Sequence, residues 1–208
     1  MNKTRLEAFS DGVLAVAITL LVLDLPVDRG SPLSLAEQLR GEWPTFAAYV
    51  VSFFIIGVVW LNHHALFRVA SDVDQRVQVY NLMLLMFVTA IPFVTSTYAD
   101  YVRDGGMDAK VAVLAYGIVM EGMSISFTLI LGRLQKAGLT AVGSGVDSRK
   151  LLVRYGIGHL IYPVITVVSW FYPPVMLVLY SIVIAYYFGP GLHTLDALDA
   201  SRDPAPTG

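Results

Sequence analysis

The sequence predicts an all-α integral membrane protein that crosses the bilayer six times in each chain. Hydrophobic residues make up 56% of the 208 residues and charged residues only 14%, which differs sharply from a water-soluble domain of this length. Apolar runs close to the roughly 20 residues that a membrane helix needs recur along the chain. Short polar breaks with Pro or Gly separate these runs.

The six expected spans form one transmembrane domain over residues 1–191. They cover about 5–25, 44–67, 77–98, 110–132, 151–171 and 173–189. Residues 192–208 are small and polar, and their composition predicts a disordered C-terminal tail.

Two helix starts are indicated by capping boxes. Thr4 and Glu7 form one before the first apolar run. Ser34 and Glu37 form another before a short amphipathic helix, which we expect at the membrane interface.

Charge distribution predicts the orientation. An even number of crossings places both termini on one side, and the Lys and Arg excess marks that side as cytoplasmic. Charges within the first span also indicate that it is retained rather than cleaved. We therefore expect a multi-pass protein of an inner or plasma membrane. The expected cytoplasmic residues are Lys3, Arg5, Arg68, Arg76, Arg133, Lys136, Arg149, Lys150 and Arg154, against Arg29, Arg40, Arg103 and Lys110 outside.

Several function classes lack support in the sequence. The formal net charge of −2 gives no basic surface for nucleic acid. There is no cysteine, no P-loop and no hydrolase motif, so we expect neither an enzyme nor a cofactor. Asp11 with His63 and His64 is a weak metal set, because adjacent side chains on a helix point about 100° apart. We predict no metal site.

Polar residues cluster at the inner end of the first two spans. Arg5, Ser10 and Asp11 begin the first span, and Trp60 and His63 reach the same level because the second span runs in the opposite direction. A charge at membrane depth is costly and faces protein or water. We therefore predict a buried network of Arg5, Ser10, Asp11 and His63, and we interpret it as structural.

One stripe of the first span has the spacing of a helix face. Val16, Thr19, Leu20 and Leu23 lie at i, i+3, i+4 and i+7. In four copies around an axis, the three apolar side chains would form hydrophobic rings over about 10 Å. Such rings can close by dewetting, while Thr19 would offer hydroxyl oxygens to a cation. From periodicity alone, ordinary helix packing is the simpler interpretation.

Four more polar residues each allow a structural and a functional interpretation. Glu121 in the fourth span and His159 in the fifth lie at comparable depth and can pair, either as a structural or protonated pair or as a proton carrier. Asp24 and Asp28 near the outer end of the first span either concentrate cations at a pore mouth or are simply solvated.

Two motifs resemble the transmembrane protein 175 family of potassium channels. The segment RLEAFSDGVLAVAITLLVLDLP matches the pattern R-x-x-x-F-S-D followed by T-L-L, and the second span contains G-x-x-W-x-x-H. The residues concerned are Arg5, Phe9, Ser10 and Asp11, with Gly57, Trp60 and His63.

The resemblance implies a prokaryotic member with one six-helix unit per chain. Such a member assembles as a homotetramer around the first span and conducts potassium ions across the bilayer. The resemblance assigns the apolar constriction to Val16, Leu20 and Leu23 and links Thr19 to selectivity. Val16 departs from the larger Ile or Leu that is usual at the first ring.

We therefore predict a potassium-selective channel with passive conduction through a hydrophobic constriction. The alternative is a proton-coupled secondary transporter that uses Asp11, His63 or Glu121, and a third possibility is a membrane scaffold without transport. A channel passes current under potential alone, whereas a coupled transporter needs its second ion.

Overall fold

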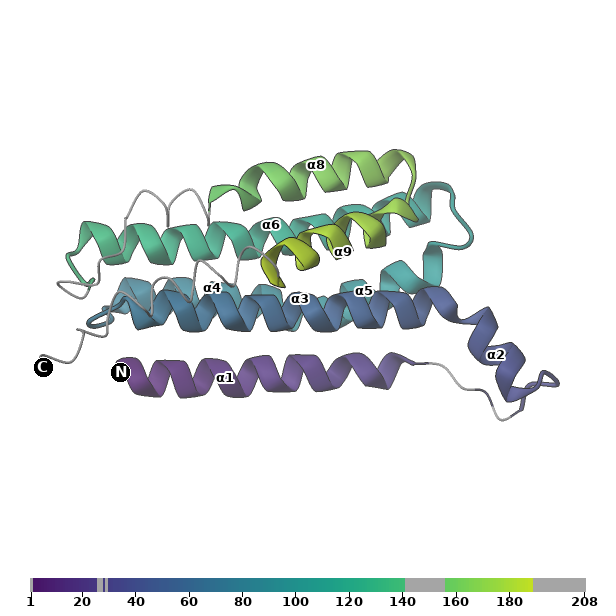
Figure 1. Cartoon of the computed structure of the whole chain (residues 1–208), viewed down its shortest axis with the longest axis horizontal. Coiled ribbons are helices and arrows are strands. Elements are labelled where there is room, and N and C mark those ends of the chain that lie inside the picture. The colour runs from purple at the N-terminus through teal and green to yellow at the C-terminus, as the bar shows by residue number, and fades with distance from the viewer. Residues whose placement is uncertain (1, 26–27, 29, 141–155, 189–208) are drawn as a thin grey trace, which may run out of the picture.

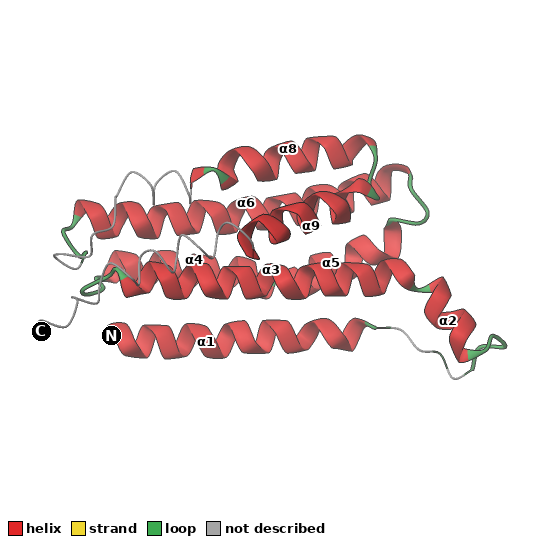
Figure 2. Ribbon diagram, in the orientation of Figure 1, coloured by secondary structure: helices red, strands yellow, loops and turns green. Residues whose placement is uncertain are grey.

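The described part of the chain is helical. A computed structural model describes residues 2–25, 28, 30–140 and 156–188, and Figure 2 shows helices joined by loops over these residues. An isolated bridge joins Ala70 to Thr140. The elements are α1 (Lys3–Leu20), the 3₁₀-helix η1 (Leu21–Asp24), α2 (Leu35–Gly41), α3 (Trp43–Arg68), α4 (Gln75–Thr89), α5 (Ile91–Tyr101), α6 (Gly106–Lys136), α8 (Gly158–Phe171) and α9 (Val175–Phe188).

Long apolar helices confirm a multi-pass membrane protein. Four segments are long and apolar enough to cross a bilayer, namely Lys3–Leu23, Trp43–Arg68, Gln75–Tyr101 and Gly106–Lys136. α8 and α9 are apolar but have only 14 residues each, so six crossings per chain stay a prediction. The expected start of the fifth span (151–155), residue 189 and the tail (192–208) lie outside the described residues.

The predicted third span is two helices. α4 ends at Thr89, and α5 begins at Ile91 with Pro92 in its first turn. Proline lacks the backbone N–H that a continuous helix would use, but it fits the first turn of a new helix. The expected single helix over 77–98 is therefore wrong in this detail.

Capping decides where α1 and α2 begin. The Asn2 side chain accepts a hydrogen bond from the Arg5 backbone N–H at 3.0 Å, so α1 begins at Lys3 and the predicted capping box of Thr4 and Glu7 is wrong. An Asn one residue before the helix satisfies an amide that Thr4, already inside the helix, does not. The second predicted box is confirmed, because Ser34 and Glu37 cap each other reciprocally at α2.

The helices form three layers. α1 packs on α3, α4 and α5, and α6 packs on α4, α5 and α8. α9 contacts α3 and α8. Figure 1 shows α1 along one side of the bundle and α8 along the opposite side. α1 therefore contributes one face to the core and leaves the other face open.

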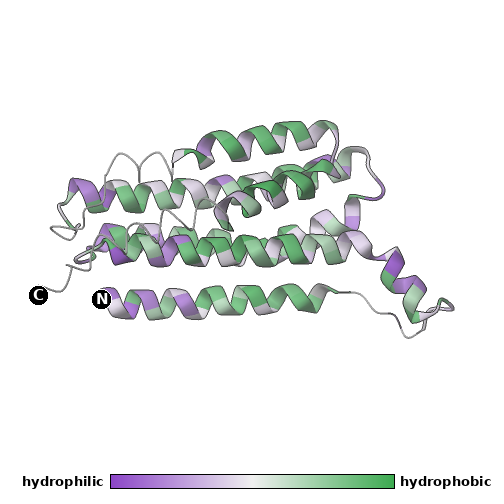
Figure 3. Cartoon of the chain, viewed as in Figure 1, coloured by the Kyte–Doolittle hydropathy of each residue, from purple (hydrophilic) through white to green (hydrophobic). Residues whose placement is uncertain are grey.

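The polar ends of the helices bracket an apolar middle (Figure 3). The start of α1 lies at the same end of the bundle as the end of α3, the start of α4 and the end of α6 (Figure 1); we call this the inner end. It carries most of the described basic residues: Lys3, Arg5, Arg68, Arg76, Arg133 and Lys136, against Arg40, Arg103 and Lys110 elsewhere.

An ion pair at the inner end joins α4 to α6. Asp74 caps α4 through the Val77 N–H at 2.9 Å, and the Arg133 Nε–H donates to Asp74 Oδ2 at 2.7 Å. The Arg133 guanidinium holds the pKa of Asp74 below its usual range. The carboxylate therefore stays ionised, and its contribution to stability is lost progressively as the pH falls from the usual range of an Asp carboxyl through that lowered pKa.

Candidate ion pathway and its supporting network

α1 has one packed face and one open face. The packed stripe consists of Leu6, Ser10, Leu14, Ala17 and Leu21, all buried at helical spacing. The predicted pore stripe lies on the open side: Val16 is 56% exposed, Leu20 40% and Leu23 74%. Thr19 is also exposed. These four residues are therefore free to face another chain, lipid or water.

The outer end of the stripe is stretched by a change of helix type. α1 ends at Leu20 and continues as a 3₁₀-helix over Leu21–Asp24, so the expected α-helix to residue 25 is too long. In a 3₁₀-helix, side chains at i and i+3 eclipse and each residue rises about 2.0 Å. Leu23 therefore lies above Leu20, and the stripe spans about 12 Å rather than the expected 10 Å.

The Thr19 hydroxyl presents oxygen rather than hydrogen to the open face. Its Oγ1 donates to the backbone carbonyl of Val16 at 2.8 Å. Because this bond uses the hydroxyl hydrogen, the two lone pairs of the oxygen remain available as acceptors. Such an oxygen can contact a cation, because its hydrogen points to the Val16 carbonyl and away from the open face.

A buried polar cluster fixes the inner end of α1. The Asn81 amide donates to Ser10 Oγ at 2.9 Å, and Asn81 Oδ1 lies 2.9 Å from His63 Nε2. An amide oxygen only accepts, so the His63 Nε2 carries the proton. All three residues are buried. This cluster, Ser10–Asn81–His63, connects α1, α3 and α4.

Asp11 and Arg5 are not part of this cluster. The Trp60 indole N–H donates to Asp11 Oδ1 at 3.0 Å, but Asp11, Arg5 and Phe9 are exposed in the single chain. Among the described residues, the Arg5 side chain has no hydrogen bond or ion pair. The predicted buried network of Arg5, Ser10, Asp11 and His63 is therefore wrong in its membership, because Arg5 and Asp11 are exposed and Asp11 bonds to Trp60 instead of to Ser10 or His63.

Asn81 is the residue of this cluster that the sequence patterns do not identify. It is a polar residue inside an apolar helix, the same signal that marked His63 and Asp11. Its partners lie 71 and 18 residues away, so spacing along the chain does not reveal the contacts.

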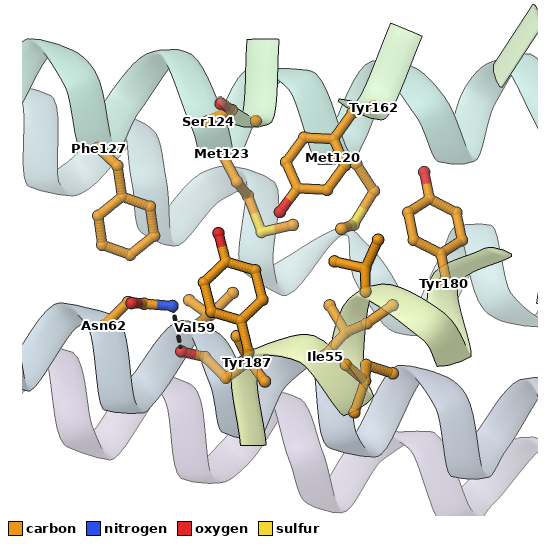
Figure 4. Close-up of a pocket in the computed structure, with 14 residues that line it drawn as sticks. Ile55, Val59, Asn62, Met120, Met123, Ser124, Phe127, Tyr162, Tyr180 and Tyr187 are labelled. Carbon is orange, nitrogen blue, oxygen red and sulfur yellow. Dashed lines mark hydrogen bonds between the residues drawn. The ribbon is translucent and has the colours of Figure 1, made fainter. Parts of the chain in front are cut away.

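The remaining predicted residues lie at the outer end and in the far layer. Asp28 is exposed and accepts from the Gly30 N–H at 2.8 Å, whereas the side chain of Asp24 lies outside the described part. The expected pair is present, with Glu121 Oε1 and His159 Nδ1 2.6 Å apart. A pocket between α3, α6, α8 and α9 lies on that side of α3, with the Tyr162 and Tyr187 side chains reaching into it (Figure 4).

Comparison with known proteins decides the family. A family model described as the endosomal/lysosomal potassium channel TMEM175 matches residues 5–92. A potassium channel from Streptomyces collinus is 38% identical over 192 residues, which cover 90% of this chain and 92% of that protein. The chain belongs to the TMEM175 family of potassium channels. This is a family of ion channels and not of enzymes.

Other relatives agree in fold and in part of the sequence. A crystal structure of a lysosomal potassium-selective channel TMEM175 homologue from Chamaesiphon minutus superposes with a TM-score of 0.77 at 29% identity, over 89% of this chain and 95% of that chain. The human endosomal/lysosomal proton channel TMEM175 is 35% identical over 116 residues, which are 50% of this chain and 23% of that protein.

The TMEM175 match covers the elements of the candidate pathway. Residues 5–92 include nearly all of α1, all of α3 and α4, and the start of α5. The open stripe of α1 and the Ser10–Asn81–His63 cluster both lie within this range. The far layer of α6, α8 and α9 lies outside it.

Replacing Asn81 should destabilise the bundle without touching the open stripe. Asn81→Leu leaves Ser10 and His63 without their buried partner, which costs about 1–3 kcal/mol. Denaturant unfolding of the solubilised protein measures this loss. Thr97→Val is the control, because the Thr97 hydroxyl donates only to the Phe93 carbonyl of its own helix.

A double-mutant cycle with His63→Leu tests whether the cluster acts as one unit. We expect a coupling energy above about 0.5 kcal/mol, because each single replacement already breaks the shared bond. Additive losses would show that the two residues stabilise the bundle separately.

Proposed function

We propose that this chain is a potassium-selective channel in which ions pass passively between the open faces of four α1 helices. The exposed stripe of α1 carries this proposal. It is apolar apart from Thr19, it lies opposite the packed stripe, and it falls in the segment that matches the TMEM175 model. The potassium channel names of the bacterial relatives support potassium as the permeant ion.

The charge on α1 supports an assembly of chains. Asp11 lies about 12 Å along the helix from Lys3, and its carboxylate is exposed in the single chain apart from the Trp60 contact. A carboxylate at this depth is costly against lipid. A closed ring of subunits places it against protein or water, and cyclic symmetry favours identical contacts.

The stripe has the properties of a hydrophobic gate. Val16, Leu20 and Leu23 would form three apolar rings, between which the Thr19 oxygens offer a brief contact to a dehydrating ion. Narrow apolar rings stop ions by losing water and conduct when they wet. Asp28 and Asp24 near the outer end of α1 would raise the cation concentration at the mouth. The basic inner end faces the cytoplasm in this proposal, together with both termini.

A proton-coupled transporter gains less support from the structure. His63 bonds to Asn81 rather than to Asp11, and the Glu121–His159 pair lies in the layer farthest from α1. The three residues therefore do not form one relay. Current driven by potential alone in a proteoliposome separates the two functions, because a coupled transporter requires its second ion.

Polar replacements in the stripe should open the channel. Leu23→Ser and Val16→Ser favour wetting of their rings, so we expect a several-fold rise in potassium flux into liposomes. Thr19→Val retains the shape, removes the oxygen and should lower the preference for potassium over sodium, measured as a shift in reversal potential.

Val22→Ser is the matched control for the stripe. Val22 is 49% exposed but lies off the stripe, whereas Leu21, at 2% exposed, belongs to the core and its replacement would disturb packing. A flux increase in Val22→Ser with no change in the two stripe variants would show that α1 turns another face to the axis.

The assembly itself should be fourfold. Native mass spectrometry of the detergent-solubilised chain should give a tetramer. Asp11→Ala should weaken it, because the variant loses the Trp60 contact that holds α1 on α3 within each chain and so fixes the helix that would form the axis. A strictly monomeric wild-type protein would rule out a pore shared between chains.

A further inference from the structure

We propose that Glu121 and His159 form a proton-binding site at the middle of the membrane, in which Glu121 is a neutral carboxylic acid that keeps its proton and donates a hydrogen bond to His159. The ligand is one proton per chain. Glu121 is the central residue of α6 (Gly106–Lys136). The site lies in the layer away from α1, so it is independent of the proposed pore.

Close helix packing brings the two residues together. A Cβ at Gly117 would clash with the Thr166 side chain, and one at Gly158 would lie 2.5 Å from Ser124 Oγ. Only glycine therefore allows α6 and α8 to approach this closely. At this separation Glu121 Oε1 reaches His159 Nδ1 at 2.6 Å.

The hydrogen bonds around His159 fit a neutral imidazole. Its Nε2 lies 2.9 Å from Thr128 Oγ1, which can accept the Nε2–H. Nδ1 then carries a lone pair and accepts a hydrogen bond from the Glu121 Oε1–H. The Ser124 hydroxyl, 3.5 Å from Nδ1, is a weak second contact.

The second oxygen of Glu121 indicates which residue holds the proton. Glu121 Oε2 is buried and has no hydrogen-bond partner in the described part of the chain. In an ionised carboxylate this oxygen would bear half of the negative charge with no donor to stabilise it. In the neutral acid it is an uncharged carbonyl oxygen, for which burial costs far less.

Within the described part of the chain, the helices around Glu121 supply no cation to hold a carboxylate. On α6 the nearest basic residues are Lys110, placed over the Trp170 ring, and Arg133, paired with Asp74; both lie about 17 Å away along the helix. α4 lies against α6 through Phe87 and Gly122, and its Arg76 is about 17 Å along α4 from Phe87. α5 has no basic residue. In the described α8, His159 is the only charged or imidazole group, and α9 has none. The other titratable side chains that interact with Glu121 are Tyr162 and Tyr180.

Partial exposure of the pair strengthens the case for neutrality. The Glu121 and His159 side chains are 27% and 31% exposed. At the middle of a membrane helix, that exposed part meets hydrocarbon or the adjoining pocket rather than bulk water. A neutral hydrogen-bonded pair is the cheapest state there.

Infrared spectroscopy of the full chain in liposomes at neutral pH tests the proposal. A protonated carboxyl gives a carbonyl band separate from those of carboxylates, and we expect this band to disappear in Glu121→Gln. It should persist in Asp108→Asn, which removes an exposed acid at the start of the same helix. Loss of a carboxylate band instead of the acid band in Glu121→Gln would show an ion pair and overturn the proposal.

Stability against pH gives a second readout. Gln mimics the neutral acid, because its N–H can donate to His159 Nδ1. Wild type and Asp108→Asn should lose thermal stability as the pH rises from the range where an unfolded carboxyl ionises, because the unfolded chain then releases a proton that the folded chain keeps. Glu121→Gln should lose less over the same range. His159→Gln should shift the acid band by changing its acceptor. A Glu121→Gln protein that fails to fold, or one whose stability falls with rising pH as much as that of wild type, contradicts a neutral Glu121.

Discussion

The hydrocarbon around the bundle forces polar side chains to find partners within the protein, and these partnerships determine how the layers are joined. Three polar clusters connect successive layers, because an unsatisfied group at membrane depth costs several kcal/mol. They are Ser10–Asn81–His63 between α1, α4 and α3, Ser52–Thr95–Tyr116 between α3, α5 and α6, and Glu121–His159 between α6 and α8. Apolar packing fills the space between the clusters, and glycines at Gly117 and Gly158 let α6 and α8 approach closely.

The same constraint gives α1 its two faces. Its packed face ends in the polar cluster at the inner end, and its Lys3 ammonium donates to the Ala70 carbonyl at 2.8 Å. The exposed side of α1 carries the apolar stripe, and the carboxylate of Asp11 lies on the flank beside it, in line with Ala15 and Val22 and bonded to Trp60 of α3. Lipid is a favourable environment for the apolar stripe but not for a carboxylate, whereas an assembly of several copies around an axis provides protein or water for both. Membership of the TMEM175 family and the open face of α1 therefore support the same interpretation.

Part of this organisation could be predicted from the sequence, because the hydrophobic periodicity of a helix and the depth of a residue along its span depend only on neighbouring residues. The four long apolar segments and the depth match of Glu121 with His159 follow from residue spacing, whereas the stripe was separated from ordinary helix packing only by the resemblance to the TMEM175 family. The role of Asn81 did not follow, since its contacts depend on the packing of three helices. Pro92 is evident in the sequence, but the sequence alone does not show that one helix ends and another begins there, because proline is tolerated inside some membrane helices. Arg5 was expected in the core because a charged side chain inside the bilayer is energetically unfavourable. A residue so near the end of a helix can instead extend its side chain to the membrane interface.

The central claim is that the open face of α1 lines the ion path, and cysteine accessibility tests it most directly. The chain has no native cysteine, so single replacements from residue 15 to residue 23 each introduce one thiol without background. A water-soluble thiol reagent applied during potassium current recordings should block variants at Val16, Thr19, Leu20 and Leu23, and spare those at Ala15 and Val22. Block at Ala15 and Val22 with none along the stripe would contradict the account.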